Sequence, residues 1–116
     1  MALRQGDIYW GHFPSGMRRP LIVVSREELN RGLYAVVVPC TTGRLNERSG
    51  LPSCVVFHAG QFGLPRSCVA QAEMIQVTEK ANLDVESGAV GRLDSETLRD
   101  LVKAIGYVLD AELEPQ

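Results

Sequence analysis

The sequence has few cysteines and no long apolar run. Its three cysteines, Cys40, Cys54 and Cys68, are odd in number and widely spaced, which matches neither a disulfide framework nor a Cys-x-x-Cys zinc motif. We interpret all three as small buried apolar residues. The longest strongly apolar stretch, residues 33–40, is too short to cross a bilayer, and the first residues lack the apolar core of a signal peptide. We therefore expect a cytoplasmic protein.

Several common motifs for phosphate binding and hydrolysis are also missing. The sequence contains no Gly-rich phosphate loop, no Gly-x-Ser-x-Gly elbow and no His-Glu-x-x-His pair. The two histidines, His12 and His58, lie in separate segments. A two-histidine ribonuclease would need them to meet in space, and the alternative is two unrelated imidazoles. We expect neither a metal nor a cofactor.

Charge is distributed unevenly along the 116 residues, whose formal net charge is −2. Residues 1–50 hold seven arginines and four acidic residues, whereas residues 51–116 hold five basic and ten acidic residues. A basic half built only from arginine suits phosphate recognition, because guanidinium groups bind phosphate in a bidentate way. An unevenly charged, solvated surface is the alternative.

The chain length predicts one domain, residues 1–116, that needs no disulfide or metal to fold. β-Branched and aromatic residues between turn signals predict short strands over residues 5–13, 18–24, 33–41, 54–57, 67–70, 74–78 and 88–93. The segment 33–41 has the pattern of a strand buried on both faces. Residues 43–52 are polar and charged, so we expect an exposed mobile loop there.

Three helical segments are predicted. Ser25 and Glu28 form a capping-box pattern for a short helix that ends near Gly32. Residues 81–86 favour one helical turn. The clearest helix begins after Asp94 or Ser95, and its apolar residues follow helical spacing at Leu98, Leu101, Val102, Ile105, Val108, Leu109 and Leu113. Many short strands followed by one helix indicate a mainly β fold: a small antiparallel barrel with a C-terminal helix packed on it.

Two strand ends carry candidate functional side chains. Arg18 and Arg19 enter a strand directly after a loop, and Thr41 and Thr42 leave another strand into a second loop. Rigid strands that hold polar groups beside mobile loops are a common mounting for binding and catalytic residues. The alternative is that Arg19 makes a structural ion pair and that the threonines simply suit a strand end.

Three segments have the order and spacing of one known family. They are Gly6-Asp7-Ile8-Tyr9-Trp10, Arg19-Pro20-Leu21-Ile22-Val23-Val24-Ser25 and Val37-Val38-Pro39-Cys40-Thr41-Thr42. Further matches are Pro52-Ser53, Gly63-Leu64, Ser67, Glu73-Met74-Ile75 and Gly91-Arg92-Leu93. Over almost its whole length, the sequence resembles the MazF/PemK toxin family.

This resemblance implies an SH3-like barrel with a C-terminal helix, a homodimer, and sequence-selective cleavage of single-stranded RNA. It also implies an antitoxin whose peptide blocks the RNA groove. The family's catalytic arginine and threonine correspond to Arg19 and Thr41, and a serine implicated in RNA contact corresponds to Ser15. The sequence departs from the family in its short loop 14–18 and in residues 74–76, where a Gln-Ile-Arg segment is common.

The expected chemistry needs no metal, because RNA supplies its own nucleophile, the 2′-hydroxyl. We expect Arg19 to stabilise charge on the phosphate and Thr41 to donate a hydrogen bond to the leaving oxygen. RNA contacts are expected from Arg18, Thr42, Arg44 and Arg48 beside the two loops.

Two other functions remain open at this level. One is that of the CcdB-like gyrase-inhibiting toxins, which share the fold but place target-binding residues, including a tryptophan, at the C-terminal end. Here the single tryptophan is Trp10. The other is a barrel that binds nucleic acid or protein without catalysis.

Overall fold

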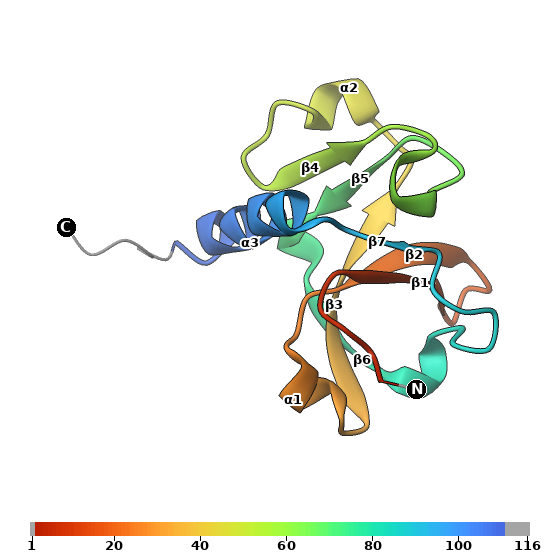
Figure 1. Cartoon of the computed structure of the whole chain (residues 1–116). Coiled ribbons are helices and arrows are strands. Elements are labelled where there is room, and N and C mark those ends of the chain that lie inside the picture. The colour runs from red at the N-terminus through yellow and green to blue at the C-terminus, as the bar shows by residue number, and fades with distance from the viewer. Residues whose placement is uncertain (1, 111–116) are drawn as a thin grey trace.

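The computed structural model describes residues 2–110 of the chain (Figure 1). Its strands are β1 (Asp7–His12), β2 (Arg18–Val23), β3 (Tyr34–Thr41), β4 (Cys54–Phe57), β5 (Cys68–Gln71), β6 (Gln76–Glu79) and β7 (Gly91–Arg92). Its helices are α1 (Glu27–Asn30), α2 (Leu45–Arg48) and α3 (Ser95–Val108), with single 3-10 turns η1 (Gln61–Gly63), η2 (Ala72–Met74) and η3 (Lys80–Asn82).

Strand β3 organises the sheet because it changes partner along one edge. On that edge β6 pairs with its residues 34–37, and β5 pairs with Cys40 and Thr41. On the other edge β2 pairs with residues 37–39. All of these pairings are antiparallel, and the strand order is β4-β5-β3-β2-β1-β7. The expected antiparallel barrel with a C-terminal helix is confirmed in the form of a curled, half-closed sheet (Figure 1).

Both faces of the central strands are buried, because successive side chains point to opposite sides. On β2, Ile22 joins one apolar cluster and Leu21 and Val23 join another. The first cluster includes Ile8, Val38, Phe57, Leu64 and Leu101, and the second includes Leu3, Tyr9, Val37 and Leu83. The expectation that residues 33–41 are buried on both faces therefore holds for most of β3, although Tyr34 is exposed.

Helix α3 packs beside β4 and η2 (Figure 1). Its predicted N-cap is confirmed, because the Asp94 carboxylate accepts a hydrogen bond from the Thr97 N–H at 2.7 Å. Leu101 and Ala104 are buried on its inner face. The helix ends at Val108, and the part of the prediction that reaches Leu113 lies outside the described residues. No helix within residues 2–110 is long and apolar enough to span a membrane.

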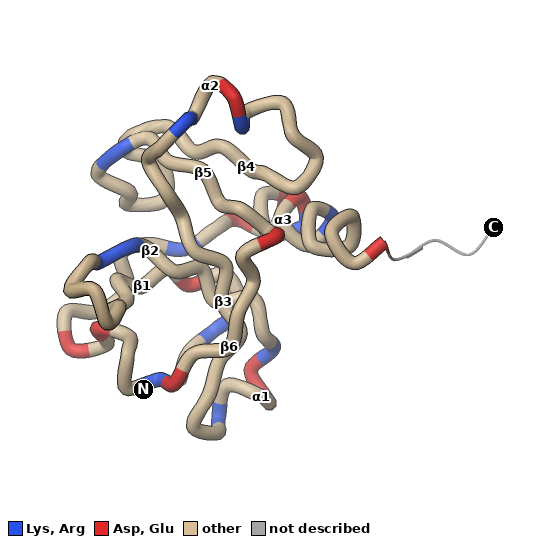
Figure 2. The backbone as a smooth tube through the Cα atoms, turned by 180° about the vertical axis from the view of Figure 1, so that it is seen from behind, with Lys and Arg blue, Asp and Glu red and all other residues tan. Residues whose placement is uncertain are grey.

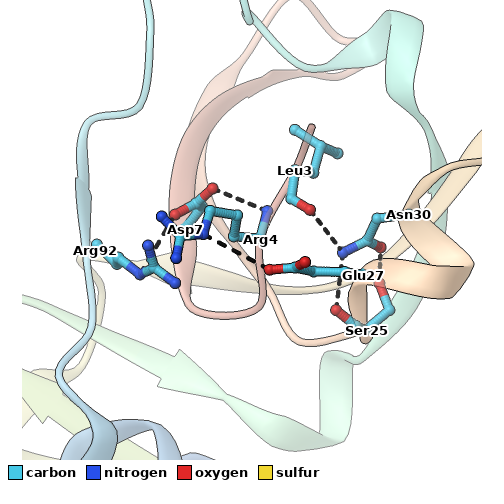
Figure 3. Close-up of polar contacts among 7 residues, drawn as sticks. All are labelled: Leu3, Arg4, Asp7, Ser25, Glu27, Asn30 and Arg92. Atoms are coloured by element: carbon cyan, nitrogen blue, oxygen red, sulfur yellow. Dashed lines mark hydrogen bonds and ion pairs between the residues drawn. The ribbon is translucent and has the colours of Figure 1, made fainter. Parts of the chain in front are cut away.

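The predicted capping box at Ser25 is wrong. Helix α1 begins after Arg26, and no side chain caps it. Ser25 is buried instead, where its hydroxyl bonds with the Asn30 side chain and accepts from the Val36 N–H. The Asn30 amide also donates to the carbonyls of Ser25 and Leu3, as Figure 3 shows for Leu3. The competing polar partners inside the fold outweigh the local cap.

The same view shows how the start of β1 is fixed. The buried Asp7 carboxylate accepts from the Arg4 N–H at 3.0 Å and lies 3.8 Å from the Arg92 guanidinium on β7 (Figure 3). The turn that precedes β1 is thereby tied to the strand that precedes α3.

Four predicted boundaries need correction. The segment 43–52 is exposed but contains α2, and β6 begins at Gln76 because Ala72–Met74 forms η2. The turn predicted at 81–86 is η3, which begins at Lys80, and the strand predicted at 88–93 shortens to β7. The ends of β6 and β7 are set by pairing with β3 and β1, which local sequence does not encode.

Candidate active site

A pocket of about 600 Å³ opens between the start of β2, the end of β3 and the segment that leads into β5. Its polar lining consists of Arg18, Arg19, Thr41, Thr42 and Arg66. Its apolar lining consists of Trp10, Met17, Pro20, Leu64, Pro65, Cys40 and Cys68. None of these lining residues is acidic or a histidine, so the pocket is cationic. Its volume lies within the ordinary range for ligand sites.

The sheet brings Arg19 and Thr41 to this pocket through its register. Leu21 of β2 pairs with Pro39 of β3, and continuing that register by two residues sets Arg19 opposite Thr41. Directly opposite residues share a face of an antiparallel pair. The paired register of β2 and β3 ends at Leu21 and Pro39, and the pocket opens beyond that last pair, where Arg19 and Thr41 line it.

Arg19 is held by the loop that precedes its own strand. Its Nε–H donates to the Met17 sulfur at 3.3 Å, and its guanidinium carbon lies 5.9 Å from the centre of the Phe13 ring. Thioether sulfur is a weak acceptor, and an aromatic face attracts a cation without neutralising it. The Arg19 charge is therefore oriented but still available to an anion.

Arg18, the neighbouring residue, is held differently. Successive side chains of a strand point to opposite faces, so Arg18 leaves β2 on the side of Trp10. Its guanidinium carbon lies 5.5 Å from the centre of the Trp10 ring, and its Nη2 lies 3.0 Å from Asp84 Oδ2. Asp84 thus balances the charge of Arg18.

The two threonines lie where β3 runs into the loop before α2. Thr41 is half-buried, and its Oγ1 accepts from the Gly43 N–H at a long 3.4 Å. The Thr41 hydroxyl proton is free to point into the pocket, because that bond uses only the oxygen lone pair. Thr42 is exposed.

Two cysteines, Cys40 and Cys68, form part of the pocket floor. Both are buried, as predicted, whereas Cys54 is only half-buried. The hydrogen bond between the Cys40 thiol and Cys68, together with burial, raises the pKa of Cys40 well above its ordinary value. Cys40 is therefore neutral at physiological pH and adds no charge to the pocket.

The remaining predicted site residues lie around the pocket rather than in it. Ser15 lines a neighbouring hollow of about 250 Å³, which Arg19 and Met17 also line. Arg44 and Arg48 belong to the α2 segment, where Arg48 donates to the Gly43 carbonyl at 2.9 Å. Neither arginine lines the pocket.

Sequence reasoning did not identify Arg66 as a pocket residue, nor Trp10 as the ring against which Arg18 packs. Arg66 is exposed, follows Pro65, and reaches the pocket from the segment before β5. Figure 2 shows basic positions at the start of β2 and in this segment on the same side of the molecule. The one sequence signal that could have indicated Arg66 is its position directly after Pro65, at the end of the predicted turn region.

The Arg66 side of the pocket is fixed by a close glycine contact. Gly63 has φ +80°, and a Cβ on it would lie 2.0 Å from the Val90 carbonyl oxygen. A Cβ on Gly91 would lie 1.6 Å from the Phe62 carbonyl oxygen. Only glycine allows η1 to approach β7 this closely.

The whole-chain comparison decides the family. Residues 4–109 match the family described as PemK-like, MazF-like toxin of type II toxin-antitoxin system. This chain belongs to that family. It is 29% identical to the probable endoribonuclease MazF5 of Mycobacterium tuberculosis. The alignment of 107 residues covers 91% of this chain and 92% of that protein. MazF-family toxins are endoribonucleases, and the chain is assigned to that enzyme class.

Solved structures of MazF-like proteins share its fold. An endoribonuclease in complex with its cognate antitoxin, from a mycobacterial species, superposes with a TM-score of 0.79 at 21% identity, over 97% of this chain and all of that one. The Mycobacterium tuberculosis toxin MazF-mt6 gives 0.75 at 23% identity, over 91% and 98%. MazF bound to MazE from Deinococcus radiodurans gives 0.75 at 19% identity, over 97% and 99%.

Proposed function

We propose that this MazF-like toxin cuts single-stranded RNA at a short sequence motif without a metal ion. The 2′-oxygen of one ribose forms a bond to the adjacent phosphorus, and the bond from phosphorus to the 5′-oxygen breaks. The products are a 2′,3′-cyclic phosphate and a free 5′-hydroxyl. The observation that carries this proposal is that Arg19 and Thr41 line one cationic pocket.

Arg19 is proposed as the electrostatic catalyst. Negative charge builds up on the non-bridging phosphate oxygens during the displacement, and a fixed guanidinium stabilises it. Arginine stays protonated at physiological pH, which suits this role and makes it a poor general base. The Met17 and Phe13 contacts orient Arg19 without neutralising it.

Thr41 is proposed to donate a hydrogen bond to the departing 5′-oxygen. Its hydroxyl lies on the strand across from Arg19, which supports an arrangement with attacking and leaving oxygens on opposite sides of the phosphorus. The lining residues include no carboxylate or imidazole to take the 2′-proton. In this proposal water accepts that proton, and the leaving oxygen takes one through Thr41 or water.

The RNA strand is proposed to follow the positive charge around the pocket. Arg19 and Arg66 make no ion pair to an acidic residue within residues 2–110, so both are available to phosphates. Thr42, Ser15, Arg44 and Arg48 extend this path over the adjoining loops. DNA lacks the 2′-hydroxyl and would bind without being cut.

The assembly of this chain is proposed to follow that of its family. A homodimer is proposed, together with an antitoxin peptide that occludes the pocket, as the names of the antitoxin-bound relatives suggest. Exposed apolar side chains around β6, namely Met74, Val77 and Tyr34, offer a surface for such contacts. The chain is expected to act as one domain in the cytoplasm.

The decisive experiment incubates the purified chain with mixed RNA and single-stranded DNA in the presence of EDTA, then maps the ends. We expect cuts in RNA only, unaffected by EDTA, with cyclic phosphate at the new 3′ ends. If RNA is not cut and the chain alters gyrase-dependent supercoiling of a closed circular plasmid in a parallel assay, a gyrase-inhibiting toxin is favoured. RNA binding without cuts would reduce the protein to a binding module.

A further inference from the structure

Arg18 differs from the other two arginines of the pocket because its guanidinium is fixed from two sides. It packs over the Trp10 ring at 5.5 Å and bonds to Asp84 at 3.0 Å. Its side chain nevertheless remains 47% exposed. Arg18 therefore has protein contacts on two sides and still lines the pocket with an accessible side chain.

Asp84 is itself anchored, so the ion pair is more than a loose surface contact. Its N–H donates to the Trp10 carbonyl at 2.8 Å. Its carboxylate accepts from the Ser87 hydroxyl at 2.9 Å and from the Ser87 N–H at 3.3 Å. Trp10, Arg18 and Asp84 thus form a connected unit that joins β1, β2 and the segment after η3.

The charge of this unit argues against a phosphate contact. A phosphate that approaches Arg18 would compete with a bound carboxylate and be repelled by it, whereas Arg19 and Arg66 have no acidic partner in the described part of the chain. A guanidinium plane is weakly hydrated and stacks well on aromatic surfaces. Unpaired RNA bases are commonly recognised by such stacking on arginine or aromatic planes.

We propose that Arg18, backed by Trp10 and oriented by Asp84, is a nucleobase-stacking subsite of this pocket. The proposal rests on the proposed function and assigns the expected RNA contact of Arg18 to a base. Two adjacent residues of β2 then have different roles. Arg19 binds the phosphate, and Arg18, which leaves the strand on the opposite face, stacks on a base. Asp84 is a positioning residue that acts through Arg18.

The test compares two probes that share a backbone charge and differ only in bases. One is a short mixed-sequence 2′-O-methyl RNA, which lacks the nucleophile and stays intact, and the other is an abasic strand of the same length. Affinity is measured by fluorescence anisotropy over a range of salt concentrations. The variants are Arg18→Met, Asp84→Asn and, as a matched control, Arg66→Met, each checked by thermal unfolding.

Arg18→Met should weaken binding of the base-bearing strand about tenfold and leave the abasic strand unchanged, as expected for the loss of one stacking contact. Arg66→Met should weaken both strands alike and lower the salt slope by about 0.7, the value for one phosphate contact on a single strand. Asp84→Asn should weaken the base-bearing strand and steepen the salt slope on the abasic one, because the released Arg18 reaches a phosphate.

An equal loss on both strands with Arg18→Met, or no loss on either, overturns the subsite. The cleavage assay on mixed RNA separates this failure from that of the proposed function. If the wild-type chain cuts RNA but Arg18→Met has no base-dependent effect on binding, only the subsite is overturned. A base-dependent Arg18 effect without any cuts sinks the nuclease and leaves the subsite standing.

Discussion

The Nε–H of Arg19 donates to the sulfur of Met17 at 3.3 Å, across a loop that is only a few residues long. The short loop 14–18 therefore supplies the group that orients the proposed catalyst. A carboxylate at this point would have neutralised the charge, and the thioether does not. Orientation and availability of the cation are both preserved.

Replacing Arg19 with alanine should lower kcat for RNA cleavage by about 100- to 1000-fold, the usual cost of one preorganised donor. The fold should survive, because the interactions of the Arg19 guanidinium in residues 2–110 are a hydrogen bond to Met17 and a contact with the Phe13 ring, and it makes no ion pair there. Arg31→Ala, an exposed arginine beside α1, is the matched control. Circular dichroism and single-turnover cleavage measure the two properties, and near-normal activity of Arg19→Ala would remove it from the mechanism.

Thr41→Val keeps the shape of the side chain and removes the hydroxyl. We expect a fall in the cleavage rate of about tenfold or more, with RNA binding unchanged, because the lost hydrogen bond would form only as the 5′-oxygen departs. Thr41→Ser should restore much of the rate. Equal activity of the valine and serine variants would assign Thr41 a purely structural role at the end of β3.

Asp84 should titrate below an ordinary aspartate. The pKa of its carboxyl is lowered first by the hydrogen bonds from the Ser87 hydroxyl and N–H, and then by the charges of Arg18 and His12. A lowered pKa in the folded state contributes stability above the ordinary aspartate value of about 3.9, and this is lost as pH falls through the folded-state pKa.

In a carboxyl-carbon NMR titration, Ser87→Ala should raise the Asp84 pKa more than Arg18→Met does, because Ser87 is the larger cause. The reverse order would mean that the ion pair dominates.

Leu101→Ala should destabilise the fold by about 2–5 kcal/mol, the range for truncating a fully buried leucine. Leu101 is 0% exposed and joins Ile8 and Ile22 in the core. Val102, its neighbour on α3, is 38% exposed, and Val102→Ala should change stability far less. Urea denaturation measures both, and similar losses would contradict the packing of α3 described above.

The sequence predicted the elements whose patterns are long and local. The spacing of Leu98, Leu101 and Ile105 indicated α3, and Asp94 indicated its cap, because both signals lie within a few residues of one another. The expectation that Arg19 and Thr41 lie together depended on family resemblance, and the register of β2 on β3 supplies its physical reason.

Non-local contacts account for what the sequence did not predict. Ser25 satisfies a capping pattern, yet its hydroxyl is taken by Asn30 and Val36 inside the fold. Asp84 pairs with Arg18 across 66 residues, and no local pattern links the two. Arg66 lines the pocket from the segment after η1, and η1 packs closely against β7, far along the sequence.

The Gly63–Gly91 approach also bears on how the pocket is completed during synthesis. The strands that carry Arg19 and Thr41 emerge from the ribosome early, whereas the segment that supports the Arg66 side is translated after most of the chain. A nascent polypeptide that has not reached Gly91 has the first half of the pocket without the support for the second. The support of the Arg66 side therefore depends on a residue that is translated after every residue that lines the pocket.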